Sequence, residues 1–144
     1  MLRCVGEGAG PDARTLQQRT GSAAEREVVD RLVAQGWQVL ATNVRVGRDE
    51  LDIVALDPGP PAMLVVAEVR FRSRRDFGLP EETVDRRKWW RVWRAASTLL
   101  GRGSLPDGSP IPLRPLRIDL IVVEPPSRDK RSPRMRHYRA AEPL

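Results

Sequence analysis

Cysteine, histidine and lysine are scarce in this sequence of 144 residues. The only cysteine is Cys4, so the chain offers neither an internal disulfide framework nor a thiolate metal site. The only histidine, His137, lies in residues 135–139, which could form a short edge strand, and we expect it to be structural rather than catalytic. The candidate metal ligands that remain are carboxylates.

Long apolar segments are absent as well. No stretch approaches the ~20 apolar residues that cross a bilayer, and the N-terminal part lacks the hydrophobic region of a signal peptide. We therefore expect a cytoplasmic protein without a membrane partner. Residues 1–20 mix glycine, proline, arginine and glutamine without periodicity, and we expect them to be a disordered segment outside the fold.

Positive charge exceeds negative charge, with 25 basic and 19 acidic residues and a net charge of +6. Only Lys88 and Lys130 are lysine, and coding bias explains such arginine dominance as well as nucleic-acid binding does. The surface should still attract phosphate groups. Residues 124–144, a basic and proline-rich tail that would include the edge strand, carry half of the net charge.

Residues 49–72 show the clearest alternation of polar and apolar residues in the chain. Segments 50–56 and 63–71 alternate in polarity around the turn sequence DPGPPA, which predicts a β-hairpin. A turn centred on Pro60 sets Asp52 opposite Glu68 and Glu50 opposite Arg70. One face of the hairpin is predicted to be core, and it comprises Leu51, Ile53, Ala55, Met63, Val65, Ala67, Val69 and Phe71. The other face is predicted to carry most of the charge.

Two carboxylates directly opposite each other on paired strands repel, so Asp52 and Glu68 need a positive partner. A divalent cation is one solution, and oxygen-only ligands suit Mg²⁺ or Mn²⁺. The alternative is that Arg70 or Arg72 neutralises the pair, with Glu50 and Arg70 forming a cross-strand ion pair. Both interpretations remain open.

A first helix is predicted to begin at Ser22, because Ser22 and Glu25 have the spacing of a capping box, and to end at Gly36. Glu25 lies on the apolar stripe of this helix. It either caps its own helix or reaches toward Asp52 and Glu68. Residues 37–44 follow as a strand.

A second helix is predicted over residues 82–100, with Lys88 at the edge of its buried stripe, able to lean toward the hairpin. The stripe comprises Trp89, Val92, Trp93, Ala96, Leu99 and Leu100. Trp90 lies instead with the arginines of the outer face, which are Arg87, Arg91 and Arg94. This group either binds a nucleic acid strand or is a cation–π cluster on a solvated face. Likewise, the polar loop with Arg72, Arg74 and Arg75 either grips a phosphate backbone or is merely solvated.

Residues 116–123 are a predicted buried strand, and a strand that follows a helix typically returns to the sheet through a crossover. The sequence therefore predicts one α/β domain over residues 21–123. Its element order is α-β-β-β-α-β, with a mixed central sheet flanked by helices and room for a short C-terminal strand.

A set of short motifs carries a resemblance to a known family. They are Gly21 with Ala24-Glu25, Asn43, Glu50-Leu51-Asp52-Ile53-Val54-Ala55, Glu68-Val69-Arg70 with Arg72, Phe77-Gly78 with Pro80, Lys88, Ala95-Ala96 and Arg117-Ile118-Asp119. In this order and spacing, from about Gly21 to Val123, the chain resembles the YraN-like family of small bacterial proteins. That family is predicted to be endonuclease-related, with a restriction-endonuclease-like fold similar to that of archaeal Holliday junction resolvases.

The resemblance implies a metal-dependent phosphodiesterase site in which Asp52 and Glu68 hold Mg²⁺ or Mn²⁺ and Glu25 completes the acidic cluster. The family's lysine two residues after the glutamate would orient or deprotonate the attacking water. Here that position is Arg70, which stays protonated and cannot act as a base. The metal-bound water could suffice with Arg70 as an electrostatic partner, Lys88 could replace the missing amine, or the site could bind nucleic acid and cut it slowly or never.

Two functions follow from these alternatives. The first is a metal-dependent endonuclease-like protein that hydrolyses phosphodiester bonds in DNA, with branched or structured DNA as candidate substrates. The second is a catalytically impaired nucleic-acid-binding protein of the same fold, and a protein-interaction scaffold is a third class. DNA is favoured over RNA as the partner, and the protein is expected to be a monomer or a homodimer.

Overall fold

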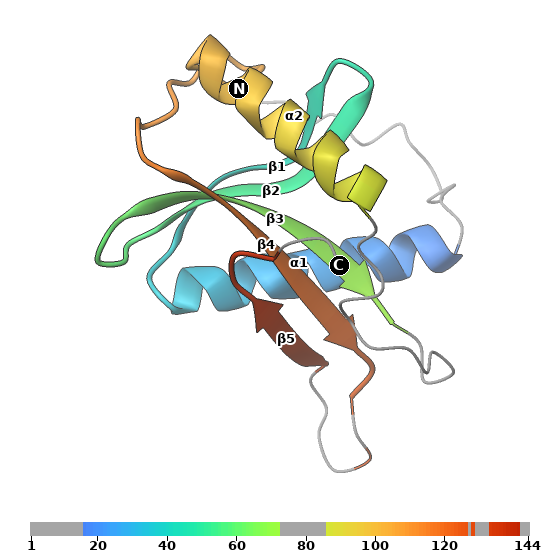
Figure 1. The fold of residues 1–144 in the computed structure, drawn as a ribbon. Helices are drawn as coiled ribbons and strands as arrows, with labels where there is room; N and C mark the ends of the chain where they lie inside the picture. Colours follow the sequence, from blue (N-terminus) through green and yellow to red (C-terminus); the bar gives the residue numbers. More distant parts are fainter. Residues whose placement is uncertain (1–15, 73–85, 127, 129–132, 142–144) are drawn as a thin grey trace, which may run out of the picture.

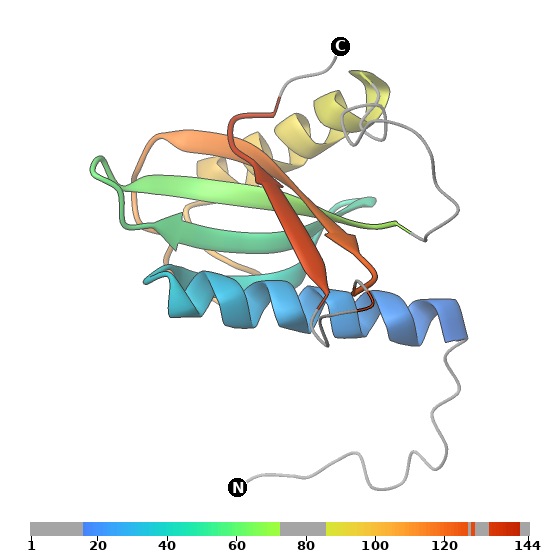
Figure 2. The same ribbon diagram turned by 90° about the horizontal axis from the view of Figure 1, so that it is seen from below.

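The structure is a computed structural model that describes residues 16–72, 86–126, 128 and 133–141. In this part of the chain, five strands form one mixed sheet with a helix on each face (Figures 1 and 2). The elements are α1 (Leu16–Ala34), β1 (Gln38–Val46), β2 (Asp49–Asp57), β3 (Met63–Phe71), α2 (Arg86–Arg102), β4 (Leu116–Glu124) and β5 (Arg134–Tyr138). Neither described helix is long and apolar enough to cross a membrane.

The strands are arranged in chain order, β1-β2-β3-β4-β5. Neighbouring strands are antiparallel except for β3 and β4, which are parallel. A parallel pair requires the chain to return to the starting end of the sheet, and α2 lies in that connection (Figure 1). The predicted element order, the crossover and the short C-terminal strand are confirmed.

Apolar residues fill both faces of the sheet. Toward α1, the hairpin contributes Ile53, Ala55, Val65 and Ala67. Toward α2, it contributes Leu51, Val54, Leu64 and Val66. We predicted that the second face of the hairpin carries most of its charge, and α2 covers the middle of that face, where Val54 and Val66 are buried. Exposed charge is confined to the end of the hairpin that carries Asp52 and Glu68.

Leu51 is on the opposite side from the one predicted. It packs in the cluster beneath α2 together with Val44, its partner on β1, whereas Ile53 packs against α1. Asn43 lies between the Val44–Leu51 and Thr42–Ile53 pairs and has a φ of 51°, in the left-handed region. The departure from strict alternation on β2 therefore occurs opposite an irregular residue of its partner strand β1.

Three predicted boundaries differ from the structure. Helix α1 begins at Leu16, so Ser22 lies inside the helix and is not its N-cap, and residues 16–20 belong to the fold. Helix α2 is described from Arg86, and the predicted residues 82–85 lie outside the described part of the chain. At the end of β3, Phe71 was predicted to be core but is 45% exposed.

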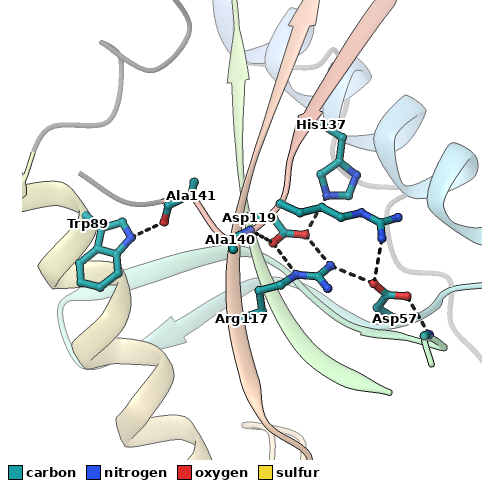
Figure 3. A network of polar contacts seen from close by, with 9 residues as sticks. Asp57, Trp89, Arg117, Asp119, His137, Ala140 and Ala141 are labelled. Carbon is teal, nitrogen blue, oxygen red and sulfur yellow. Dashed lines mark hydrogen bonds and ion pairs between the residues drawn. The ribbon is translucent and has the colours of Figure 1, made fainter. Parts of the chain in front are cut away.

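A buried polar network fixes β5 to the sheet (Figure 3). Asp119 of β4 is fully buried, accepts hydrogen bonds of 2.8 and 2.9 Å from Arg117, and contacts His137 Nε2 at 2.8 Å. Arg117 also donates a 2.9 Å hydrogen bond to the Asp57 carboxylate. Asp57 is the last residue of β2, at the end away from the carboxylate pair. Burial acts against the charge on Asp119, but the hydrogen bonds from His137 and Arg117 lower its pKa. His137 therefore has a structural position, as predicted.

Candidate active site

Asp52 and Glu68 lie side by side at one end of the β2–β3 hairpin. The hairpin pairs Ile53 with Ala67, which is the predicted register. Asp52 precedes Ile53 and Glu68 follows Ala67, so this register brings the two acids together. The Asp52 carboxyl lies close enough to Glu68 to affect the pKa of Glu68. Asp52 Oδ2 also accepts a 2.8 Å hydrogen bond from the backbone N–H of Val69. This hydrogen bond fixes the position of the Asp52 carboxylate.

Glu68 is 5% exposed, and its environment disfavours the charged form. Burial, followed by the hydrogen bond and the negative charge of Asp52, raises the pKa of Glu68 to about 8. The positive charges of Lys88 and Arg70 act in the other direction but do not cancel this effect. At neutral pH Glu68 accordingly keeps its proton, which relieves the repulsion expected between two acids on opposite strands.

Lys88 places an amine beside this pair. Its Nζ is 3.7 Å from Glu68 Oε1, at the range of an ion pair. The first described turn of α2 carries this residue, and the helix lies across β2 and β1, so packing of α2 positions the amine. The predicted lean of Lys88 toward the hairpin is confirmed.

Glu25 approaches the same region from α1. Because α1 begins at Leu16, Glu25 is well inside the helix, and the interpretation that it caps its own N-terminus is wrong. Burial, and then the charge of Asp52, raises the pKa of Glu25, while a hydrogen bond with the Asn43 side chain opposes the shift. The left-handed conformation of Asn43, which asparagine tolerates better than most residues, occurs at the position that contacts Glu25.

Arg70 does not form the predicted ion pair. Glu50 instead lies 3.9 Å from Arg45 of β1, its partner in the β1–β2 register. The Nε of Arg70 is buried and has no hydrogen-bond partner among the described residues. Arg70 therefore has an unused hydrogen-bond donor beside the carboxylate pair. Because a buried donor without a partner is energetically costly, a ligand that accepts this hydrogen bond would be favoured.

A cleft of about 330 Å³ opens over the two carboxylates. Its lining comes from the β1–β2 turn region, the carboxylate pair and α2, and comprises Arg48, Asp49, Glu50, Asp52, Glu68, Lys88, Arg91 and Val92. Both signs of charge therefore line one cavity, with carboxylates at its centre and two arginines among its walls. Sequence reasoning missed Arg48. Its place directly before Asp49 and after Gly47, in the tight turn between two strands, was the available signal.

The predicted nucleic-acid-binding residues separate into three groups. Arg87, Trp90 and Arg91 lie together and line, with Arg94, a second depression of about 460 Å³ on α2. Arg72 is only 8% exposed, so it has little surface to offer a ligand. The other two, Arg74 and Arg75, lie outside the described residues.

The donor set fits a hard divalent cation of the kind that proteins bind with few ligands. Mg²⁺ is usually held by one or two carboxylates, with water and substrate phosphate oxygens completing its shell, and Asp52 with Glu68 supplies two carboxylates. No group of three or more acidic, histidine or cysteine residues suitable for a metal is present within the described ranges. The charge of Asp52 raises the pKa of Glu25, but Glu25 does not form a three-carboxylate cluster with Asp52 and Glu68.

A family model and several related proteins match this chain. The model of the uncharacterised protein family UPF0102 matches residues 24–123. A UPF0102 protein of Symbiobacterium thermophilum is 38% identical over 111 residues, which cover 76% of this chain and 86% of that protein. Another, from Chlorobaculum parvum, is 36% identical over 127 residues, covering 86% of this chain and 92% of that protein. A third, from Sorangium cellulosum, is 41% identical over 91 residues, covering 63% and 61%. These matches confirm the resemblance to the YraN-like proteins, and the chain belongs to the UPF0102 family.

Proposed function

We propose that this protein is a metal-dependent endonuclease-like enzyme that hydrolyses phosphodiester bonds in DNA. The observation that carries the proposal is the placement of Asp52 and Glu68 in one cleft, with Lys88 Nζ 3.7 Å from Glu68 Oε1. Perturbed carboxyl groups that converge with an amine in a cavity are typical of catalytic sites.

Asp52 and Glu68 would hold the divalent cation. When bound, Mg²⁺ or Mn²⁺ supplies a polarised phosphoryl oxygen and a water of lowered pKa. The Val69 N–H keeps Asp52 oriented, since it donates to Oδ2 and leaves Oδ1 for other partners. Glu68 must lose its proton before it can act as a ligand, because metal ligands bind as carboxylates.

The cationic residues have distinct roles in this proposal. Lys88 places an amine beside Glu68, so it is the candidate to orient or deprotonate the attacking water. Arg70 cannot serve as a base, but its unpaired Nε and planar guanidinium suit the binding of a phosphate oxygen. The cleft arginines Arg48 and Arg91 would attract the DNA backbone to the carboxylate pair.

The test is cleavage of a supercoiled plasmid and of a synthetic four-way junction in the presence of Mn²⁺. Asp52→Asn and Glu68→Gln keep the shape of each side chain and remove the carboxylate, so both should abolish cleavage. Asp30→Asn is the matched control, because Asp30 is an exposed acid on α1 away from the cleft, and it should cut like the wild type. Cleavage that survives in both cleft variants would contradict the proposal.

A second function is favoured by one observation, the presence of Arg70 where the YraN-like proteins have lysine. If Lys88 does not replace that amine, the site would bind DNA without cutting it. Binding of the four-way junction in a gel at about 50 mM salt, with no cleavage by wild type in Mn²⁺, is the expected result for this alternative, since low salt favours phosphate contacts.

A further inference from the structure

The outer face of α2 carries an exposed aromatic residue surrounded by arginines. Trp90 is 51% exposed and forms, with Arg87, Arg91 and Arg94, the lining of the depression of about 460 Å³. The described helix, RRKWWRVWRAASTLLGR, contains no acidic residue. We predicted two alternatives for this group, and no arginine of the described chain stacks over the Trp90 ring, since both cation–π contacts there involve Trp37. The ring therefore keeps a face available for stacking.

Trp90 is held in place from behind. Its ring meets the Trp89 ring edge-on, with centroids 5.1 Å apart and planes at 88°. Trp89 in turn stacks on Trp93 and donates a 2.7 Å hydrogen bond from Nε1 to the carbonyl oxygen of Ala141 (Figure 3). An edge-to-face contact between aromatic rings is favourable, so Trp89 supports the position of the Trp90 ring.

The depression and the carboxylate cleft share one lining residue, Arg91. This residue follows Trp90 directly in the helix. Arg87 and Arg94 lie two helical turns apart on either side of the ring, which is about 10 Å along the helix axis. A strand whose phosphate is bound at the cleft could therefore continue along α2, with cations for its backbone and a ring for a base.

We infer that Trp90 stacks an unpaired base of the DNA strand that enters the cleft, so that the preferred substrate has a single-stranded segment next to a duplex. This inference rests on the proposed DNA substrate. Aromatic side chains bind single strands by stacking on the faces of successive bases. In an intact duplex those faces are covered by neighbouring base pairs, so the exposed Trp90 ring should add little to the affinity for blunt duplex DNA.

The test measures binding without cleavage, in EDTA, to a blunt duplex and to the same duplex extended by a single-stranded tail. The first unpaired position carries 2-aminopurine, whose fluorescence is quenched when it stacks. Wild-type protein should bind the tailed DNA more tightly and quench the probe. Trp90→Ala should weaken tailed binding by roughly tenfold, abolish the quenching and leave blunt-duplex binding nearly unchanged, whereas Trp90→Phe should retain most of both effects.

Charge is tested with a matched pair of exposed arginines on the same helix. Arg94→Gln should weaken tailed binding and reduce the slope of log affinity against log salt by about 0.7, as expected for one lost contact to a single strand. Arg102→Gln, in the last turn of α2, should change neither. Equal binding of blunt and tailed DNA by the wild type, or equal weakening of both by Trp90→Ala, would overturn the inference.

The outcome is independent of the cleavage assay. Trp90-dependent preference for tailed DNA without any plasmid cleavage would leave this binding site standing and remove the nuclease proposal. Metal-dependent cleavage without a tail preference would support the nuclease proposal and overturn the stacking role of Trp90.

Discussion

Asp52 and Glu68, sixteen residues apart on adjacent strands, line the same cleft. Burial of Glu68, followed by its hydrogen bond with Asp52 and the charge of Asp52, raises the pKa of Glu68 to about 8, so Glu68 keeps its proton at neutral pH. The site is therefore protonated at the pH at which a metal would compete for it. Stability, metal affinity and catalysis should all depend on this single proton.

The first prediction concerns stability as a function of pH. The folded chain holds the Glu68 proton up to a pKa of about 8, against an ordinary value of 4.5, so the native state binds more protons than the unfolded state between these limits. The free energy of unfolding should consequently fall as pH rises from about 5 to about 8. Glu68→Gln mimics the neutral acid and should flatten this part of the curve. Urea denaturation of both proteins across this range measures the difference, and parallel curves would contradict the protonation of Glu68.

The second prediction concerns metal binding. Calorimetric titration with Mn²⁺ should show binding that strengthens toward pH 8 and releases a proton, since Glu68 must ionise to become a ligand. Asp52→Asn should reduce the affinity by roughly tenfold or more, because the loss of a direct ligand exceeds the effect of removing an outer-shell partner. Glu25→Gln is the informative comparison, since Glu25 is engaged by Asn43 and should have the smaller effect. An equal loss in both variants would place Glu25 among the ligands.

The hairpin site was predictable because its determinants are local. Alternation around the proline-rich turn fixes the strand register, and the observed pairing of Ile53 with Ala67 follows from it. A register error of one residue would have separated Asp52 from Glu68. The position of Lys88 was also accessible, because helical periodicity placed it at the border of the buried stripe of α2.

Other features depend on contacts between distant segments. The hairpin pattern could not reveal that α2 covers its second face, because Val54 and Val66 are only two apolar residues among charges. Glu50 pairs with Arg45 because β1 lies beside β2 there, a neighbour that the hairpin pattern does not contain. The capping-box spacing of Ser22 and Glu25 predicted a helix start that the structure overrules, since a helix already under way at Leu16 leaves no free N–H groups for Ser22 to cap.

The third prediction separates the roles of Lys88 and Arg70. If Lys88 is the amine that acts on the attacking water, Lys88→Ala should lower the rate of Mn²⁺-dependent cleavage by roughly 100-fold, the usual contribution of a general acid or base. Adding Arg70→Lys to that variant should restore cleavage, because it places an amine where the YraN-like proteins have one. Arg102→Lys is the control for the same exchange at a remote exposed site. A double variant as slow as Lys88→Ala alone would show that position 70 cannot supply the amine.

The fourth prediction concerns the buried network at the other end of the sheet. Asp119 is fully buried and holds Arg117, His137 and the backbone N–H of Ala140. Asp119→Asn keeps the side-chain shape but removes the main counter-charge of Arg117. The Arg117 side chain is only 15% exposed, so water compensates little for this loss. Removal of one member of a buried ion pair typically costs about 3–5 kcal/mol, so the variant should unfold at a much lower urea concentration. Asp107→Asn, at an exposed turn where the carboxylate accepts hydrogen bonds from Ser109, should shift the urea midpoint far less. Equal midpoints for the two variants would mean that the network does not stabilise the attachment of β5.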